Sequence, residues 1–489
     1  MSGRDHDHSL SENEDCGGRP GGFSLLDHGW WPVVVGLCGA LIGTGALSDN
    51  SFLTQLATGR LILDGAVPTH DLYTWASEGT PLVVPAWGAS GLYALADRVG
   101  SGLGVRLIIA ACTAALILAL WRLSAPAKAN VARLGLVSVA ALLGVSWWNE
   151  RPQTFGYLAL AAALLVVVER RSAWWLAGIF AVWVPLHGSW AMGVPFVGAL
   201  IFVRVVESRA FGRREIGEVA AMVAGSCLGA LATPYGWSLL TFPLEQLGRE
   251  SLILIVEWRP LRLDSWMSMV FLAQGIAGSA ALLWRRMWVR SAVALGMLAL
   301  SIDAVRYAPL CAIAMVPLVA PAFAGLGTEE GISSPRRSHV AIVSGALAVA
   351  VVALMMWTPS YDLSHYPTSA VDELEARTWV GAERAELPHI LTPDWVGNYL
   401  EWRYGTEAKP WVDDRAEVHD TVELARLVAL LGEDPSRYER VIDAIDDDIV
   451  LWQSDTPFVR WLAEHEDYRI VDEVGEWTIA CRVASGFCP

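Results

Sequence analysis

Hydrophobic runs recur along the first 358 residues at a length that suits membrane helices. A helix needs about 20 mainly apolar residues to cross the hydrocarbon core of a bilayer. Many of the runs end in Trp, which is typical of anchors at the membrane surface. The pattern predicts a mainly α-helical, polytopic transmembrane bundle of about eleven spans. The expected spans are Trp30–Leu47, Leu103–Trp121, Val131–Trp148, Thr154–Val168, Ala173–Leu186, Ser189–Val203, Glu218–Thr233, Trp266–Trp284, Val289–Ile302, Tyr307–Leu326 and Val340–Trp357.

Two longer loops interrupt the predicted bundle, at residues 48–102 and 234–265. The first contains two helical stretches, near Phe52–Leu63 and Ala86–Val99, each apolar on one face. A helix of this kind lies in the plane of the membrane surface, and we expect both stretches to do so.

The pattern changes after residue 358 to short apolar runs that alternate with helical ones. Alternation of this kind predicts one soluble α/β domain over residues 359–489. Val474-Gly475-Glu476 is predicted to be the turn of a closing hairpin. The expected strands are His389–Thr392, Pro410–Val412, Ile449–Trp452, Tyr468–Val471 and Glu476–Val483, and the expected helices are Thr421–Leu431, Ser436–Ile445 and Pro457–Glu464.

Charge separates the same two parts of the chain. The formal net charge of −16 divides into −17 from residue 360 onward, where 28 acidic residues face 11 basic ones, and +1 for the rest. A nucleic-acid-binding protein would carry a basic patch, and we therefore expect no nucleic-acid partner. Residues 1–29 are polar and of mixed charge, which predicts a disordered tail rather than a signal peptide, with His6-Asp7-His8 solvated.

The basic residues of the predicted bundle also sort by membrane side. If the N-terminus is cytoplasmic, the cytoplasmic segments hold 16 Lys and Arg and the outer segments hold 8. The positive-inside rule then predicts a multi-pass protein of the inner (plasma) membrane with its acidic domain outside the cytoplasm. Cys481 and Cys488 would lie in that domain. The sequence allows either a disulfide between them or two free thiols.

Ionisable side chains collect on the predicted outer face of the bundle. Ionisable groups at membrane depth are costly and therefore suggest function. Asp49 also suits the simpler role of a helix cap, and His187 that of a packing residue. The candidates are Asp49, Arg60, Asp71, Arg151, His187, Tyr235, Glu257 and Arg306.

The order of short motifs around these residues resembles a bacterial branch of the GT-C class of membrane glycosyltransferases. That branch is similar to the protein mannosyltransferases that use polyprenyl-phosphate sugars. The resemblance runs from about residue 30 to residue 483. The motifs are Asp49, Ala57-Thr58-Gly59-Arg60, Pro68-Thr69-His70-Asp71, Arg151-Pro152-Gln153, His187-Gly188, Pro234-Tyr235-Gly236, Glu257-Trp258, Arg306, Asp394–Leu400 and Val412-Asp413-Asp414-Arg415.

The resemblance implies transfer of a sugar from a polyprenyl-phosphate donor to a glycan, lipid or protein acceptor at the membrane. It implies a catalytic carboxylate at Asp49, with Asp71 or Glu257 assisting. Arg60, Arg151 and Arg306 would bind the phosphate, because guanidinium groups match phosphate in geometry, and His187 and Tyr235 would line the substrate site. Some members of the class hold a divalent metal such as Mg²⁺ or Mn²⁺ with carboxylates.

This chain departs from the family pattern at three positions of the first loop. Ser51 stands where the family often has a second Asp, Gln55 where it often has His, and Ala86 where His-Glu-Trp usually has its Glu. We assign no metal ligand here, and loss of catalysis stays open. Two other functions therefore remain: a non-catalytic membrane scaffold or sensor, and a transporter or flippase-like permease.

Overall fold

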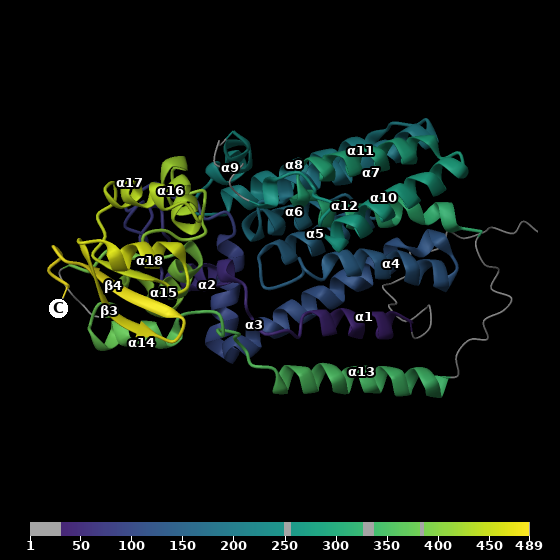
Figure 1. The fold of residues 1–489 in the computed structure, drawn as a ribbon. Coiled ribbons are helices and arrows are strands. Elements are labelled where there is room, and N and C mark those ends of the chain that lie inside the picture. The colour runs from purple at the N-terminus through teal and green to yellow at the C-terminus, as the bar shows by residue number, and fades with distance from the viewer. Residues whose placement is uncertain (1–30, 249–255, 326–336, 382–385, 489) are drawn as a thin grey trace, which may run out of the picture.

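The computed structural model describes residues 31–248, 256–325, 337–381 and 386–488 (Figure 1). The expected N-terminal tail, residues 1–29, lies outside the described residues. Helices dominate, and a small sheet forms near the C-terminus. Figure 1 shows the helices as a long bundle, with the sheet and its helices at one end of it.

A helix occupies each of the eleven segments predicted to span the membrane. Five helical segments are long and apolar enough to cross a membrane by length and composition, namely Trp87–Ala127, Trp190–Ser208, Trp266–Trp284, Val305–Phe323 and Ser338–Trp357. Four further apolar helices are shorter. The bundle helices are α1 (Trp31–Ile42), α3 (Trp87–Leu123), α4 (Asn130–Gly144), α5 (Gln153–Val168), α6 (Trp174–Leu186), α7 (Trp190–Ser208), α8 (Arg213–Leu231), α10 (Trp266–Trp284), α11 (Trp288–Asp303), α12 (Ala308–Val319) and α13 (Arg337–Trp357).

The two helices predicted inside the first loop are present, and one of them is longer than expected. α2 (Asn50–Leu63) matches its predicted range closely. The second stretch continues into the following span as α3, with a break at Ser101, where φ is +51°. A further helix, α9 (Ser238–Leu247), opens the second loop.

Small residues bring neighbouring helices of the bundle close together. A Cβ atom at Gly225 of α8 would lie 2.3 Å from the carbonyl oxygen of Ala177 in α6, so only glycine fits there. Close backbone approach at small residues is a common way for membrane helices to associate. α12 lies in the centre of the bundle and is buried almost throughout, whereas α13 lies along its side (Figure 1).

The C-terminal region, residues 359–488, contains a four-stranded sheet in the order β1-β2-β4-β3. β1 (Ile390–Leu391) and β2 (Ile449–Gln453) are parallel, while β4 (Trp477–Arg482) is antiparallel to both β2 and β3 (Tyr468–Val474). Gly475, at φ +62°, makes the predicted hairpin turn between β3 and β4. The helices of the region are α14 (Thr368–Ala376), α15 (Asp394–Tyr404), α16 (Thr421–Leu431), α17 (Tyr438–Ile442) and α18 (Pro457–Glu464).

The prediction of a strand at Pro410–Val412 was wrong. This segment makes a single bridge to Ile390, in which the Trp411 N–H donates to the Ile390 carbonyl. Pro410 has no N–H to give to a ladder, so the pairing does not extend. The helix expected at Ser436–Ile445 is also shorter, since a 3-10 turn at Pro435–Arg437 precedes α17.

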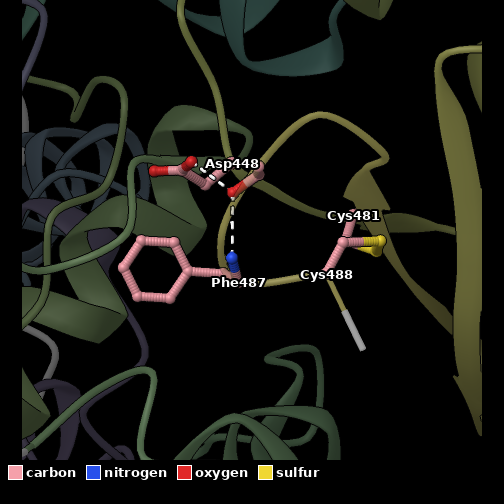
Figure 2. The surroundings of a disulfide bond; sticks show 5 residues. Asp448, Cys481, Phe487 and Cys488 are labelled. Atoms are coloured by element: carbon pink, nitrogen blue, oxygen red, sulfur yellow. Dashed lines mark hydrogen bonds between the residues drawn. A yellow bond between two sulfur atoms is a disulfide. The ribbon is translucent and has the colours of Figure 1, made fainter.

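Cys481 and Cys488 form a disulfide, with their Cα atoms 5.3 Å apart (Figure 2). The bond ties the last turn of the chain to β4. The Ser485 hydroxyl reinforces this turn by donating to Asp448 and accepting the N–H of Phe487. The C-terminal segment is thereby fixed against the sheet.

The C-terminal region docks on the end of the bundle that carries α2 (Figure 1). Leu47 exchanges backbone hydrogen bonds with Ser360 and Asp362, so the segment after α13 runs beside the loop after α1. Arg106, which is fully buried in α3, fastens the same place. Its guanidinium donates to the carbonyls of Thr44, Gly45, Leu354, Met355 and Thr358. Cations at helix C-termini are favourable because the last carbonyls lack partners within the helix.

Candidate functional site

Three loops at this end of the bundle meet at an Arg151-centred cluster. Arg151, between α4 and α5, donates from Nε to Oδ2 of Asp49 at 2.6 Å. Its NH1 donates to Oε1 of Glu257, which lies in the 3-10 turn Val256–Trp258 before α10. Burial lowers the pKa of Arg151, but the charges of Asp49 and Glu257 outweigh burial and raise it above its ordinary value. The predicted residues Asp49, Arg151 and Glu257 therefore form one site.

Glu150 holds the backbone of the Asp49 loop in place. Its Oε1 accepts the N–H groups of Ser48 and Asp49, the latter at 2.7 Å. Burial raises the pKa of Glu150, although the backbone hydrogen bonds oppose this rise. Asp49 is consequently fixed through its main chain by Glu150 and through its side chain by Arg151.

One oxygen of the Asp49 carboxylate is left without a partner. Oδ2 accepts from Arg151 and from the Asn149 amide at 3.4 Å, whereas Oδ1 is buried and has no hydrogen bond within the described chain. An unsatisfied buried oxygen costs about 1–3 kcal/mol. Asp49 is also the residue before α2, yet its side chain does not cap that helix. Its second oxygen is thus an unpaired polar atom within the site.

Arg306 and His187 lie close to this cluster. The Arg306 guanidinium stacks on the Trp258 ring at 3.9 Å from its centroid. Among the described residues, it has no hydrogen-bonded or ionic partner. Burial lowers the pKa of His187 to about 3, and the charge of Arg306 acts in the same direction. Nδ1 of the neutral His187 accepts the Ser189 N–H at 3.1 Å, which leaves the ring proton on Nε2. Both residues can donate hydrogen bonds to an anion.

The C-terminal region contributes Asp414 to the edge of the site. Oδ2 of Asp414 accepts hydrogen bonds from the hydroxyl of Ser51 and from the Asn50 amide, the latter at 3.2 Å. Burial raises the pKa of Asp414 to about 7; the Ser51 bond opposes the rise, and the charges of Asp413 and Asp49 add to it. A carboxylate thus reaches Ser51, the position at which this chain lacks an acid of its own.

Asp71 is not brought into the Arg151-centred cluster. It is 1% exposed and accepts from the backbone N–H and hydroxyl of Thr74 and from NH2 of Arg415. Arg415 also binds Asp413, whose second partner is His419. Asp71 therefore fastens the first loop to the C-terminal region through a buried ionic network.

Arg60 and Tyr235 are also placed away from Asp49. Arg60 donates to the Trp402 carbonyl at 2.8 Å and pairs with Asp97, with 41% of its side chain exposed. The Tyr235 hydroxyl donates to the Pro68 carbonyl and so joins the two long loops. Both residues hold the surroundings of the site together.

Sequence reasoning missed the roles of Glu150 and Asp414. Glu150 directly precedes the motif Arg151-Pro152-Gln153, and Asp414 lies within the motif Val412-Asp413-Asp414-Arg415. Their partners are about a hundred residues away for Glu150 and 363 residues away for Asp414. The motifs lead to these two positions, but only the fold shows what the side chains contact.

A divalent metal does not fit the residues present. In the described segments, no group of three or more His, Cys, Asp or Glu side chains is arranged to hold a metal ion. Arg151 occupies the place between Asp49 and Glu257 where a cation would lie. We therefore assign no step to a metal.

Comparison with known proteins adds no family assignment. No family model matches the chain, and no curated protein sequence matches it.

Proposed function

We propose that this protein is an integral membrane glycosyltransferase of the GT-C type. It moves a sugar from a polyprenyl-phosphate donor to a hydroxyl-bearing acceptor on the outer side of the plasma membrane. The eleven bundle helices cross the membrane, with the N-terminus in the cytoplasm and the C-terminal region outside. The end of the bundle away from that region supports this orientation, because it carries Arg-rich ion pairs such as Arg204–Glu218 and Arg290–Glu207.

The observation that carries the proposal is the divided role of the Asp49 carboxylate. One oxygen is anchored by Arg151, and the other is buried without a partner. A general base must present a free oxygen to the proton that it removes while its own orientation is fixed. Asp49 meets both conditions, and it lies directly before α2.

The transfer itself needs only a base and cationic or hydrogen-bonding groups for the phosphate. The acceptor hydroxyl oxygen bonds to the anomeric carbon of the sugar, and its proton passes to Oδ1 of Asp49. The bond from the anomeric carbon to the phosphate oxygen breaks, and the polyprenyl phosphate leaves with the electron pair. This single displacement inverts the anomeric configuration.

Arg306 and His187 are suited to the departing phosphate. The stacking on Trp258 holds the Arg306 guanidinium plane while leaving its N–H groups open. A guanidinium can donate two parallel hydrogen bonds to phosphate, and preorganised donors stabilise charge as it develops. Arg151 is less suited to this task, since Asp49 and Glu257 already occupy it. Its role is to orient the base.

The proposal is tested with the full-length protein in membranes supplied with labelled polyprenyl-phosphate sugars. The native protein and the control Asp264→Asn, which alters an exposed acid paired with Arg262 at the same end of the bundle, should transfer label equally. Asp49→Asn should lower transfer by at least a hundredfold, in line with loss of a general base. Equal transfer by Asp49→Asn would remove Asp49 as the base, and no transfer by the native protein with any donor would favour a non-catalytic scaffold.

A further inference from the structure

The first turn of α2 is held by the C-terminal region and not by its own cap residue. Asp at the position before a helix usually accepts the N–H groups of the first turn. Asp49 occupies that position, but its carboxylate is turned toward Arg151 instead. The side chains of Asn50 and Ser51, in the first turn of α2, donate to Asp414. A negative group near a helix N-terminus is favourable, and here Asp414 supplies it.

Asp414 is itself fixed by a buried contact. Its backbone N–H donates to Oδ1 of Asn398 at 3.0 Å, and Asn398 is fully buried in α15. α15 packs directly on α2, where the Thr54 hydroxyl donates to Glu401 at 2.6 Å. The position of Asp414 relative to α2 is therefore set by the docking of two helices rather than by a free loop.

We propose that Asp414 is a positioning residue of the Asp49 site. By accepting hydrogen bonds from Asn50 and Ser51, it holds the first turn of α2, and this leaves the Asp49 carboxylate free to face Arg151 and the acceptor. The C-terminal region is then a part of the catalytic centre. The link between Asp414 and catalysis rests on the proposed function. The hold of Asp414 on the first turn of α2 does not depend on that function.

Burial and the charges around Asp414 make this control sensitive to pH near neutrality. Asp413 from its own loop and Asp49 from the loop after α1 oppose its ionisation, while Arg151 lies near enough to be affected by its charge. Tyr366, stacked on Tyr399 of α15, also lies within the electrostatic reach of Asp414. Once ionised, Asp414 accepts stronger, charge-assisted hydrogen bonds. The bonds from Asn50 and Ser51 to Asp414 should therefore be stronger above pH 7 than below it, whereas the buried charge that forms there lowers the stability of the fold as a whole.

Hydrogen–deuterium exchange of the amides in residues 50–54 tests the inference without an activity assay. We expect Asp414→Ala and Ser51→Ala to raise exchange at least about fivefold, since local opening depends on the contacts that hold a turn. Asp414→Asn keeps an acceptor, so its exchange should stay near the native rate. The Asp414→Asn variant should also lack the change in exchange rate that the native protein shows between pH 6 and pH 8, after correction for intrinsic exchange. Asp434→Ala, an exposed acid of the C-terminal region, is the control.

Native-like exchange in both Asp414→Ala and Ser51→Ala would overturn the inference, whatever the enzyme does. In the transfer assay, Asp414→Ala should lower kcat about tenfold or more with KM for the donor unchanged, because misplacement of a base costs rate rather than binding. If Asp49→Asn abolishes transfer but Asp414→Ala affects neither exchange nor transfer, the positioning role fails and the proposed function stands. If the native protein transfers nothing, the proposed function fails, and the exchange result still decides the role of Asp414.

Discussion

Nε of Arg151 lies 2.6 Å from Oδ2 of Asp49, across 102 positions of the chain. The same guanidinium reaches Glu257, 106 positions further on. One side chain thus joins the loop after α1, the loop before α5 and the turn before α10. All three groups are partly or largely buried, which makes each of them dependent on the other two.

Replacement of Arg151 should destabilise the protein as well as the site. Arg151→Gln leaves two carboxylates facing each other without a cation, and breaking a buried pair typically costs about 3–5 kcal/mol. The partial exposure of these groups reduces the expected loss to about 2–3 kcal/mol. Arg151→Lys should lose less stability, since lysine keeps the positive charge but lacks the guanidinium that binds Asp49 and Glu257 at once. The melting temperature in detergent measures both, with Arg262→Gln at an exposed pair as the unaffected control; equal melting of all three variants would contradict this view.

The raised pKa of Asp414, about 7, predicts how stability depends on pH. Between pH 4 and pH 7 the folded protein keeps a proton that the unfolded chain has released. Stability from this group is therefore present at low pH and is lost as the pH rises to 7. We expect the free energy of unfolding of Asp414→Asn to rise relative to that of the native protein between pH 5 and pH 8, by at most about 1.4 kcal/mol per pH unit, and the difference in melting temperature to grow with it. A constant difference across that range would show that Asp414 does not titrate there.

The Cys481–Cys488 bond tests both the fold of the C-terminal region and its location. Alkylation without reductant should leave these two cysteines unmodified in protein taken from cells, and a digest should yield the linked peptide. Cys481→Ala/Cys488→Ala should lower the stability of the region by about 2 kcal/mol, since the bond closes a short loop. Full alkylation of both thiols in freshly isolated protein would instead indicate a reducing compartment and would contradict the proposed outer location.

Much of the local structure could be predicted from the sequence, because its signals are local. α16 and α18 agree with their predicted ranges, and both begin after side chains that accept first-turn N–H groups, Asp420 and Thr456. The strand at Pro410–Val412 failed for an equally local reason, the missing N–H of proline. Helices form in all eleven expected spans, although five helical segments of the described chain are long and apolar enough to cross a membrane by length and composition.

The site was predictable only in part. Asp49, Arg151 and Glu257 each stood out as charged residues at helix ends, and they meet because those ends share one side of the bundle. Asp71 and Arg60 stood out as charged residues of the first loop, yet their partners, Arg415 and the Trp402 carbonyl, lie in the C-terminal region. Contacts across hundreds of residues depend on how the two parts of the chain dock. The periodic pattern of apolar residues does not predict this docking.

The bonds between α2 and the C-terminal region also bear on biosynthesis. Ser51 and Thr54 are made early, but their partners Asp414 and Glu401 leave the ribosome only after the last bundle helix, α13. Until then the first turn of α2 lacks these partners. A chain that stalls or is cleaved before residue 401 therefore carries Asp49, Arg151 and Glu257 without the support that holds α2. The first turn of α2 can therefore form these hydrogen bonds only once the chain has been made through residue 414.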